Sequence, residues 1–460
     1  MMSMKKNRTV HGILLLYHHY WAKNAPTIME NINSFSKYSK FKVWSVNTEK
    51  GFPSGLNRFE FDIIVLHYSL FGSYYLLNRA FLEYIERSKS SYKIVFFQDE
   101  YHYCQQRFAF LNKYNIDCVY TLLHPDYFKD VYLKYTNVRK LVHTLTGYVD
   151  DALIENAKRF SKPDHAKNID IGYRGRPLKY YMGKGSQEKH EIAKHFSEHA
   201  KGLGLMLDLE STEKARFYGD KWYKFLGDQK ACLGTEAGVS IFDVEDVVRN
   251  EYERLIAENP SMTFEEMSER FLKRWEGNIP HRVISPRIFE AAAFRICQIL
   301  YEGEYQGILQ PMIDYIPLKK DFSNFDDVIK LFRDTQFRQQ ITENCYRDLI
   351  ASGKYSYRKF IEGFDRELMA EGFSPEHPQH EKADRMVSIA LTWYKPSNVF
   401  PRYLLFFINQ YLILGVFCRI FLYSKFGEKY IKPRLKPLLE PLYERLYRKF
   451  QKLLSIHWDA

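Results

Sequence analysis

The sequence predicts an α/β protein that consists of two doubly wound domains and a helical, basic C-terminal tail. Its 460 residues are too many for one ordinary core and favour two domains of about 150–200 residues. With 45% hydrophobic and 27% charged residues, the composition is that of a folded chain. Short apolar segments alternate with segments of helix length, as expected for parallel sheets covered by helices on both faces.

The first part of the chain carries this alternation. The apolar run at 13–16 is too short for a signal peptide and is followed at once by His18 and His19, so we expect a buried strand there. The polar segment Ser161–Asn168 contains a proline and is typical of a linker. Further strands are expected at Lys42–Val46, Asp62–His67, Lys93–Phe97, Asp117–Thr121 and Lys140–Thr144, and helices at Ala25–Lys37, Tyr74–Glu86, Tyr103–Tyr114 and Asp126–Tyr135.

The alternation resumes after the linker. Strands are expected at Ile169–Tyr173, Leu203–Leu207, Ala231–Leu233 and Ile296–Leu300, and helices at Gln187–His199, Asp243–Ala257, Thr263–Glu276, Pro286–Phe294, Phe325–Arg333 and Phe337–Ala351. We therefore divide the chain into a first domain at 1–165, a second domain at 166–370 and a tail at 371–460.

The net charge of +11 is concentrated in the tail. Residues 395–460 contain 12 Lys/Arg against 4 Asp/Glu, a net charge of +8, which leaves +3 for residues 1–394. The main body thus lacks the basic excess that is typical of nucleic-acid-binding proteins. The six cysteines form no C-x-x-C pair, which argues against a disulfide framework or a zinc site and favours a reducing compartment.

Polar residues follow the expected strands of the first domain. His18 and His19 follow the first strand, His67 ends the third, and Gln98 and Asp99 follow the fourth. In open parallel sheets, ligands bind beyond the carboxyl ends of the strands. No complete G-x-G-x-x-G, Walker A or D-x-D motif is present, which argues against nicotinamide dehydrogenases, P-loop proteins and a metal-bound nucleotide diphosphate.

A basic loop opens the second domain. The strand that ends at Tyr173 is followed by Arg174, Gly175 and Arg176, and a second glycine-containing loop leads into a helix near Gln187. Backbone N–H groups at a helix N-terminus form a phosphate site together with arginine. Arginine and lysine beside a loop are more often simply solvated, so this pattern alone leaves both interpretations open.

The segment S-P-R-I-F-E-A-A-A begins another helix. Ser285 is suited to cap it and Pro286 to occupy its first position. Arg287 and Glu290 lie three residues apart on one face, where an arginine can hold a phosphate and a carboxylate can accept hydrogen bonds from sugar or ribose hydroxyls. For these two residues alone, an intrahelical ion pair worth about 0.2–0.5 kcal/mol is an equally good interpretation.

These segments resemble the family-4 glycosyltransferases, which are retaining enzymes with the GT-B fold of two Rossmann-like domains facing a cleft. The resemblance is most specific at 284–293, where R-x-F-E-A-x-A is typical of the spore-maturation-type branch. Asp62–His67 is similar to the family's strand with the pattern Asp-x-x-x-x-His, and Lys93–Asp99 to its apolar strand that ends in a polar loop on the acceptor side. Thr146–Asp150 is similar to the segment before its linker. Gly175–Arg176 is similar to the loop that opens its second domain.

The resemblance implies how a donor nucleotide-sugar would bind. Its diphosphate would contact Arg174, Arg176, Lys189 and Arg287, and its ribose would contact Glu290. Because no D-x-D is present, cations of the protein and helix N-termini would stabilise the leaving diphosphate. We therefore expect neither a metal nor another cofactor.

The resemblance also implies catalytic residues. The E-x7-E motif of the family lacks its first glutamate here, because residue 282 is arginine, and Glu236 is expected to take that role at the donor sugar. His67 and Asp99 are the expected catalytic residues on the acceptor side, although a general base remains unassigned and His67 is equally suited to a structural role.

The tail carries features of a membrane-associated segment. Residues 403–423 form an apolar stretch of 21 residues, long enough to cross a bilayer, but Asn409 and Gln410 stand in its middle. The basic, leucine-rich segment that follows is suited to an anionic membrane surface. A true membrane span and packing of the tail helices on the protein body are the alternatives.

We therefore predict a cytoplasmic glycosyltransferase that is peripheral on the inner face of the cell membrane. Its expected partners are a nucleotide-sugar, a glycan or glycolipid acceptor (lipid-linked or a cell-surface polysaccharide) and an anionic membrane contacted by residues 395–460, with no nucleic acid. A sugar-nucleotide epimerase or hydrolase of the same fold, and a non-catalytic membrane-associated scaffold, are the alternatives.

Overall fold

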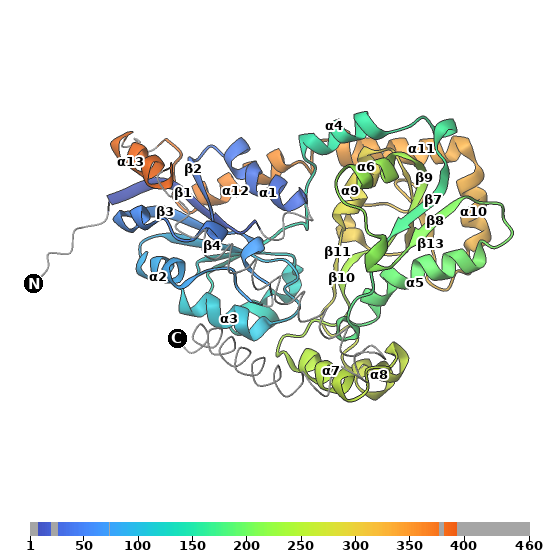
Figure 1. Cartoon of the computed structure of the whole chain (residues 1–460), viewed down its shortest axis with the longest axis horizontal. Coiled ribbons are helices and arrows are strands. Elements are labelled where there is room, and N and C mark those ends of the chain that lie inside the picture. The colour runs from blue at the N-terminus through green and yellow to red at the C-terminus, as the bar shows by residue number, and fades with distance from the viewer. Residues whose placement is uncertain (1–7, 20–25, 73, 377–380, 393–460) are drawn as a thin grey trace, which may run out of the picture.

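Two parallel β-sheets form the centres of two α/β domains (Figure 1). The computed structural model describes residues 8–19, 26–72, 74–376 and 381–392. The sheets have six and five strands, and helices cover both of them. The expectation of two Rossmann-like, doubly wound domains is thus confirmed.

The first sheet has the strand order β2-β1-β3-β4-β5-β6, and all its strands are parallel. The central strand β4 is buried at every position, because helices pack on both faces of the sheet. The strands are β1 (Arg8–Tyr17), β2 (Val43–Asn47), β3 (Phe59–Leu66), β4 (Tyr92–Phe96), β5 (Cys118–Thr121) and β6 (Lys140–His143), and the helices between them are α1 (Pro26–Tyr38), α2 (Arg79–Arg87) and α3 (Cys104–Lys113).

The second sheet has the strand order β13-β12-β9-β7-β8 and is also parallel. Its strands are β7 (Ile169–Arg174), β8 (Leu207–Glu210), β9 (Gln229–Gly234), β12 (Cys297–Tyr301) and β13 (Ile316–Leu318). The helices around it are α4 (Asp151–Phe160), α5 (Lys184–His199), α6 (Asp220–Gly227), α9 (Pro286–Ala293), α10 (Phe325–Arg333) and α11 (Thr335–Tyr346).

Two expected elements differ from the structure. The segment expected as a helix at 126–135 forms a 3-10 turn at Pro125–Tyr127 and a π-helical turn at Lys129–Leu133. The strand expected at Leu203–Leu207 instead starts at Leu207, because Gly202 and Gly204 adopt φ angles of 80° and 69° and form a turn.

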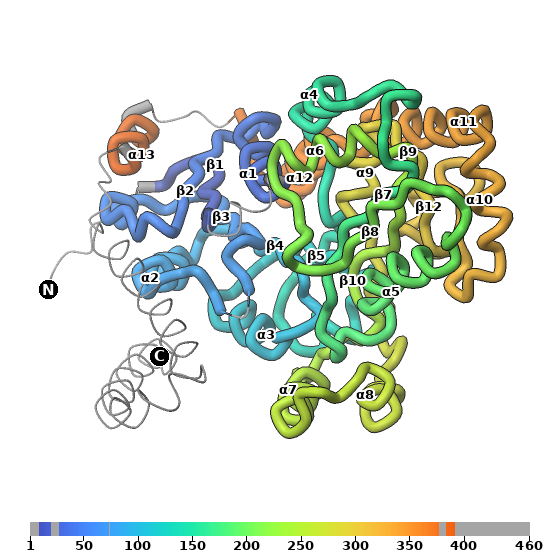
Figure 2. The backbone as a smooth tube through the Cα atoms, turned by 45° about the vertical axis from the view of Figure 1, so that its right-hand side comes forward, coloured from blue at the N-terminus to red at the C-terminus, as the bar shows by residue number. Residues whose placement is uncertain are grey.

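A helical insertion joins the two domains near the cleft. An antiparallel hairpin of β10 (Ala237–Val239) and β11 (His281–Val283) carries between its strands the helices α7 (Val247–Glu258) and α8 (Phe264–Arg270). Both helices lie apart from the second sheet, beneath the domains (Figure 2).

The insertion contacts the first domain through the N-terminal end of α3. The carboxylate of Asp246 accepts hydrogen bonds from the backbone N–H groups of Cys104 and Gln105, both at 3.2 Å. The guanidinium of Arg249 lies 4.3 Å from the ring centre of Tyr103. The two hydrogen bonds to Asp246 thus satisfy two of the backbone N–H groups that the start of a helix leaves without an intrahelical acceptor.

The chain returns to the first domain after the second sheet is complete. The helices α12 (Tyr357–Ala370) and α13 (Glu381–Thr392) lie beside the first sheet, where Figure 1 shows their orange ribbons next to blue ones. The ring of Phe364 packs edge-on against Phe35 of α1, with the ring centres 5.1 Å apart. Residues 357–370 belong to the second domain in the division expected from the sequence, but their apolar face packs on the first domain.

The two crossings between the domains run side by side. The backbone N–H of Val149 donates to the carbonyl of Tyr355 at 2.8 Å, and the N–H of Tyr357 donates to the carbonyl of Val149 at 3.0 Å. The outgoing and returning segments are therefore held together at the point where the domains meet.

Within the described ranges, the structure contains no helix that is both long enough and apolar enough to cross a membrane. The apolar stretch at 403–423 and the basic segment after it lie outside these ranges. The predicted membrane contact of the tail therefore stays a prediction.

We expect Phe364→Ala to destabilise the first domain. The side chain is 1% exposed and is surrounded by rings of the first domain, so its removal leaves a cavity that costs about 3–5 kcal/mol of unfolding free energy. Urea unfolding measures the loss, and hydrogen exchange locates it in β1–β6. Met369→Ala is the matched control, because Met369 lies in the same helix and is 38% exposed. Faster exchange confined to the second sheet would contradict this packing.

Candidate functional site

A cavity of about 260 Å³ lies at the carboxyl edge of the second sheet and faces the first domain. It is lined by residues that follow β7 and β9, by the start of α9, and by Asp99 and Thr146 of the first domain. We call it the cation cavity, because the side chains around it include Arg176, Lys189, Arg216 and Arg287.

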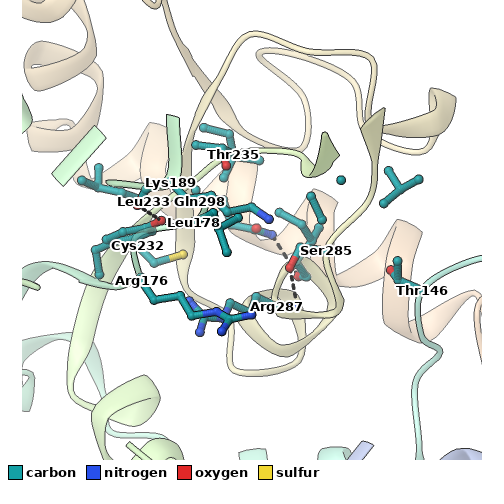
Figure 3. A pocket seen from close by; sticks show the side chains of 18 of the residues that line it. Thr146, Arg176, Leu178, Lys189, Cys232, Leu233, Thr235, Ser285, Arg287 and Gln298 are labelled. Carbon is teal, nitrogen blue, oxygen red and sulfur yellow. Dashed lines mark hydrogen bonds between the residues drawn. The ribbon is translucent and has the colours of Figure 1, made fainter. Parts of the chain in front are cut away.

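The start of α9 sets the position of Arg287, one of these cations. Ser285 caps α9, its hydroxyl oxygen accepting from the backbone N–H of Arg287 at 3.4 Å, so that Arg287 stands in the first turn of the helix. The guanidinium of Arg287 lies 5.2 Å from the ring centre of Trp222. In Figure 3 the side chains of Arg176 and Arg287 reach toward the same point. Two guanidinium groups therefore converge beside a helix N-terminus.

The cation cavity carries an excess of positive charge. Burial is the main cause that lowers the pKa of Lys189, and the guanidinium groups of Arg282, Arg287 and Arg176 contribute in the same direction. Against the opposing effect of Asp99, the resulting pKa is about 8. Arg176 is exposed and forms no ion pair with any residue in the described part of the chain. An anion bound here would relieve the repulsion among these cations.

A second cavity of about 240 Å³ adjoins the first across the start of α9. We call it the carboxyl cavity, because Glu290 and Glu30, the latter from α1, line it. Trp222 donates from its indole N–H to the carboxylate of Glu290 at 3.1 Å. Arg216 and Arg287 line both cavities, so one elongated ligand can contact the two together.

Both carboxyl groups of this second cavity hold their protons more tightly than usual. Burial, together with the smaller effects of the Asp150 and Glu290 carboxylates, raises the pKa of Glu30 to about 7. Burial also raises the pKa of Glu290 to about 7, against the opposing influence of Arg287 and Trp222. A ligand that donates hydrogen bonds would stabilise their ionised forms.

Glu236 takes part in a largely buried network of ion pairs. Its carboxylate accepts a hydrogen bond from Arg282 at 3.3 Å and another from the backbone N–H of Tyr305 at 2.9 Å. Arg282 also pairs with Glu188 of α5. Glu236 therefore faces the protein, while Thr235 before it lines the cation cavity. The predicted contact of Glu236 with a donor sugar stays a prediction.

Two further predicted site residues, His67 and Arg174, also lie outside the cation cavity. His67 is fully buried, with Nδ1 2.9 Å from Ser69 Oγ and Nε2 3.1 Å from Asn31 Oδ1. Burial lowers its pKa to about 3, so it is a neutral group that holds the loop after β3. Arg174 pairs with Asp208 at 2.8 Å and borders the carboxyl cavity. The phenyl rings on its two sides, Phe217 and Phe225, have centres 4.4 and 4.3 Å away.

Asp99 reaches the cation cavity from the first domain. It follows β4, is exposed, and adopts φ of 49°, a left-handed conformation that costs a non-glycine residue free energy. The hydroxyl of Tyr101 donates to its carboxylate at 3.4 Å. Of the predicted residues, Asp99, Arg176, Lys189 and Arg287 thus meet at the cation cavity, and Glu290 lies in the adjoining one.

Several residues that line the two cavities belong to none of the sequence motifs. Arg216 and Trp222 belong to the loop before α6 and to α6 itself, Glu30 to α1, and His281 to β11. His281 is 2% exposed, and its Nδ1 has no hydrogen-bond partner within the described ranges. No sequence motif marks these residues, because they come together only through the packing of the two domains.

In the part of the chain that the structure describes, no three His, Cys, Asp or Glu side chains stand close enough together to hold a metal ion.

Comparison with known proteins yields similarity of fold. No family model and no curated protein matches the sequence. An alpha-glucosyltransferase in complex with UDP-glucose and DNA aligns with 79% of this chain and 100% of its own, at 13% identity and a TM-score of 0.43. Sucrose-phosphate synthase from Thermosynechococcus elongatus aligns over the same shares at 10% identity and a TM-score of 0.43.

TarM aligns with 66% of this chain at 11% identity and a TM-score of 0.38, so the match spans about half, 53%, of that protein. These likenesses concern the fold class alone. The chain consists of two Rossmann-like domains that face a common cleft, as its own two sheets establish.

Because the pKa values of Glu30 and Glu290 are raised, we expect the free energy of unfolding to be lower at high pH. A folded-state pKa of about 7, above the usual value near 4.5, gives stability that is complete below pH 4.5 and is lost as pH rises through 7. Glu30→Gln removes one ionisation, so its unfolding free energy relative to the unsubstituted protein should rise by about 1–2 kcal/mol between pH 5 and pH 8.

Thermal unfolding at the two pH values measures this difference. Glu49→Gln, at an exposed glutamate of the same domain, is the control and should show no such trend. An equal pH dependence in Glu30→Gln and in the unsubstituted protein would contradict the assignment.

Proposed function

We propose that the protein is a glycosyltransferase that moves a sugar from a nucleoside diphosphate to a hydroxyl group of a glycan or glycolipid. The observation that carries this proposal is the convergence of Arg176, Lys189 and Arg287 on one cavity, with the carboxylate of Asp99 on its opposite side. The cations suit a diphosphate leaving group, and the carboxylate comes from the other domain, where an acceptor would enter.

The donor would lie across the start of α9. Its diphosphate occupies the cation cavity, where Arg176 and Arg287 offer bidentate guanidinium groups and the helix N-terminus adds its dipole. Its ribose hydroxyls donate to Glu290, and its base enters the carboxyl cavity beside Trp222 and Tyr218. Support for this placement comes from Arg216 and Arg287, which line both cavities.

The chemistry then requires charge stabilisation. The acceptor oxygen attacks the anomeric carbon, the bond from that carbon to the diphosphate oxygen breaks, and its electron pair goes to the diphosphate. Arg176, Lys189 and Arg287 stabilise the growing negative charge without a metal, which is the role of cations held in place before the reaction. We propose a metal-independent reaction on the strength of these side chains.

The acceptor proton would leave toward the first domain. Asp99 is an exposed carboxylate in the cation cavity and is therefore placed to contact the acceptor hydroxyl. Retention of the anomeric configuration is proposed from the resemblance to family-4 enzymes, and NMR of the product's anomeric proton tests it. A lipid-linked acceptor and a peripheral position on a membrane rest on the basic tail at 395–460.

We expect Arg176→Ala to weaken binding of UDP or GDP at least tenfold, because one of the converging guanidinium groups is lost. Glu290→Ala should abolish transfer while leaving the fold intact, because the ribose loses its acceptor. Isothermal titration calorimetry measures the first effect, and transfer from a panel of UDP- and GDP-sugars measures the second. Arg79→Ala, on an 85% exposed side chain paired only with its own helix, is the control.

The same measurements separate the alternatives. Failure to bind any nucleoside diphosphate would support a scaffold, and an isomerised or free sugar without acceptor product would support an epimerase or hydrolase. Full transfer by Glu290→Ala would overturn the assignment of that residue.

The lowered pKa of Lys189 predicts a pH dependence of donor binding. The lysine is charged below pH 8 and loses its proton above it, so the affinity for UDP or GDP should fall as pH rises from 7 to 9.5. The bound anion raises this pKa, and the decline therefore starts somewhat above pH 8. Calorimetry across this range should show a loss of about fivefold or more.

Two variants test the origin of the decline. Lys189→Met should bind more weakly at pH 7 and show little further loss, while Lys189→Arg should keep its affinity at pH 9.5 because arginine does not titrate there. An undiminished pH dependence in Lys189→Met would assign the effect to another group.

A further inference from the structure

A separate cavity of about 300 Å³ lies at the opposite edge of the second sheet. Three neighbouring strands, β12, β9 and β7, begin there, and each brings one cation to the cavity. Lys167 stands just before β7, Lys230 at the start of β9, and Arg295 just before β12. Arg338 of α11 completes the set.

Three carboxylates nearby are each engaged by one of these cations. Arg338 pairs with Asp164 at 2.6 Å, Lys230 with Asp170 at 2.8 Å, and Arg295 with Glu343 at 3.0 Å.

The fourth cation, Lys167, shares its carboxylate partner, Asp164, with Arg338. Its side chain is only 7% exposed, and its Nζ lies 3.8 Å from Asp164, a carboxylate that Arg338 already engages. That distance is beyond a hydrogen bond, and no other ion pair of Lys167 exists among the described residues. Burial lowers the pKa of this amine, against the effect of Asp164, and the charges of Arg338 and Lys230 add to the lowering.

A buried ammonium that no hydrogen bond satisfies is unfavourable unless a bound anion compensates it. The neighbouring guanidinium of Arg338 is 9% exposed, so a ligand would contact two poorly hydrated cations, which attract anions more strongly than exposed ones do. The cavity volume of about 300 Å³ leaves room for an anion of the size of phosphate with a short substituent.

We propose that this cavity is a second anion-binding site, independent of the donor site, which takes a phosphate dianion, either inorganic or as a small phosphate monoester. Lys167 is the residue on which binding depends most, because its ion pair is the longest of the four and its carboxylate is shared with Arg338. The site lies at the amino edge of the sheet, whereas the cation cavity lies at the carboxyl edge, so both can be occupied at once.

The test uses the full-length chain with Arg176→Ala and Lys189→Met together, which weakens phosphate binding at the cation cavity. Inorganic phosphate and glycerol 1-phosphate are titrated separately by calorimetry, which distinguishes the two sources of the anion. We expect one binding event for at least one of them, and a loss of at least tenfold in affinity on adding Lys167→Met. Lys162→Met, on a 42% exposed lysine of the same segment, should leave the affinity unchanged.

A second measurement does not depend on the folding of a variant. In the unsubstituted protein, the rate at which acetic anhydride labels Lys167 is followed by mass spectrometry, with Lys162 as the internal reference. Phosphate should slow the labelling of Lys167 severalfold, because a bound anion protects the amine and raises its pKa. Absence of binding in the double variant, equal affinity after Lys167→Met, or labelling that phosphate does not change would each overturn the proposal.

Discussion

The shape of the proposed donor site depends on one half-buried arginine. Arg282 of the hairpin pairs with Glu188 of α5 and with Glu236, and Glu236 in turn accepts from the backbone of Tyr305. This bridge ties a helix, a hairpin and the loop after β12 into one unit. A buried ion pair of this kind adds little to net stability but specifies geometry, since breaking one partner leaves a buried charge. The cavity beside it is therefore held in a defined form before any ligand arrives.

The relation between the two domains is fixed by contacts that leave the cleft itself open. The outgoing and returning segments pair at Val149, and α12 packs its aromatic face on the first sheet. On the other side, Asp246 of the insertion binds the start of α3. The first domain is therefore held from two places by parts of the chain that follow its own last strand, and Asp99 is kept opposite the cations.

Electrostatic imbalance is concentrated at sites where a ligand fits. Lys189 has a lowered pKa among arginines, and Glu30 and Glu290 have raised ones among carboxylates, in two cavities that share the start of α9. One part of the site thus favours an anion and the other a hydrogen-bond donor, as the two ends of a nucleoside diphosphate require. Lys167 at the far edge of the sheet repeats the first pattern on a smaller scale.

Local patterns in the sequence determined the alternating α/β architecture, most strand positions, and the placement of Arg287 and Glu290 on one helix, because these depend on neighbours within a few residues. Tertiary structure alone decided the rest. In the sequence, His67 and Asp99 are equally good candidates for a catalytic residue. In the structure, however, His67 is enclosed by Asn31 and Ser69, whereas Asp99 faces the cation cavity. Glu30 and Arg216 carry no motif and reach the site only because two domains and a remote loop meet there. Residues 357–370 pack on the first domain because their apolar side chains join the buried cluster around Phe35 of α1, which lies far away in the sequence.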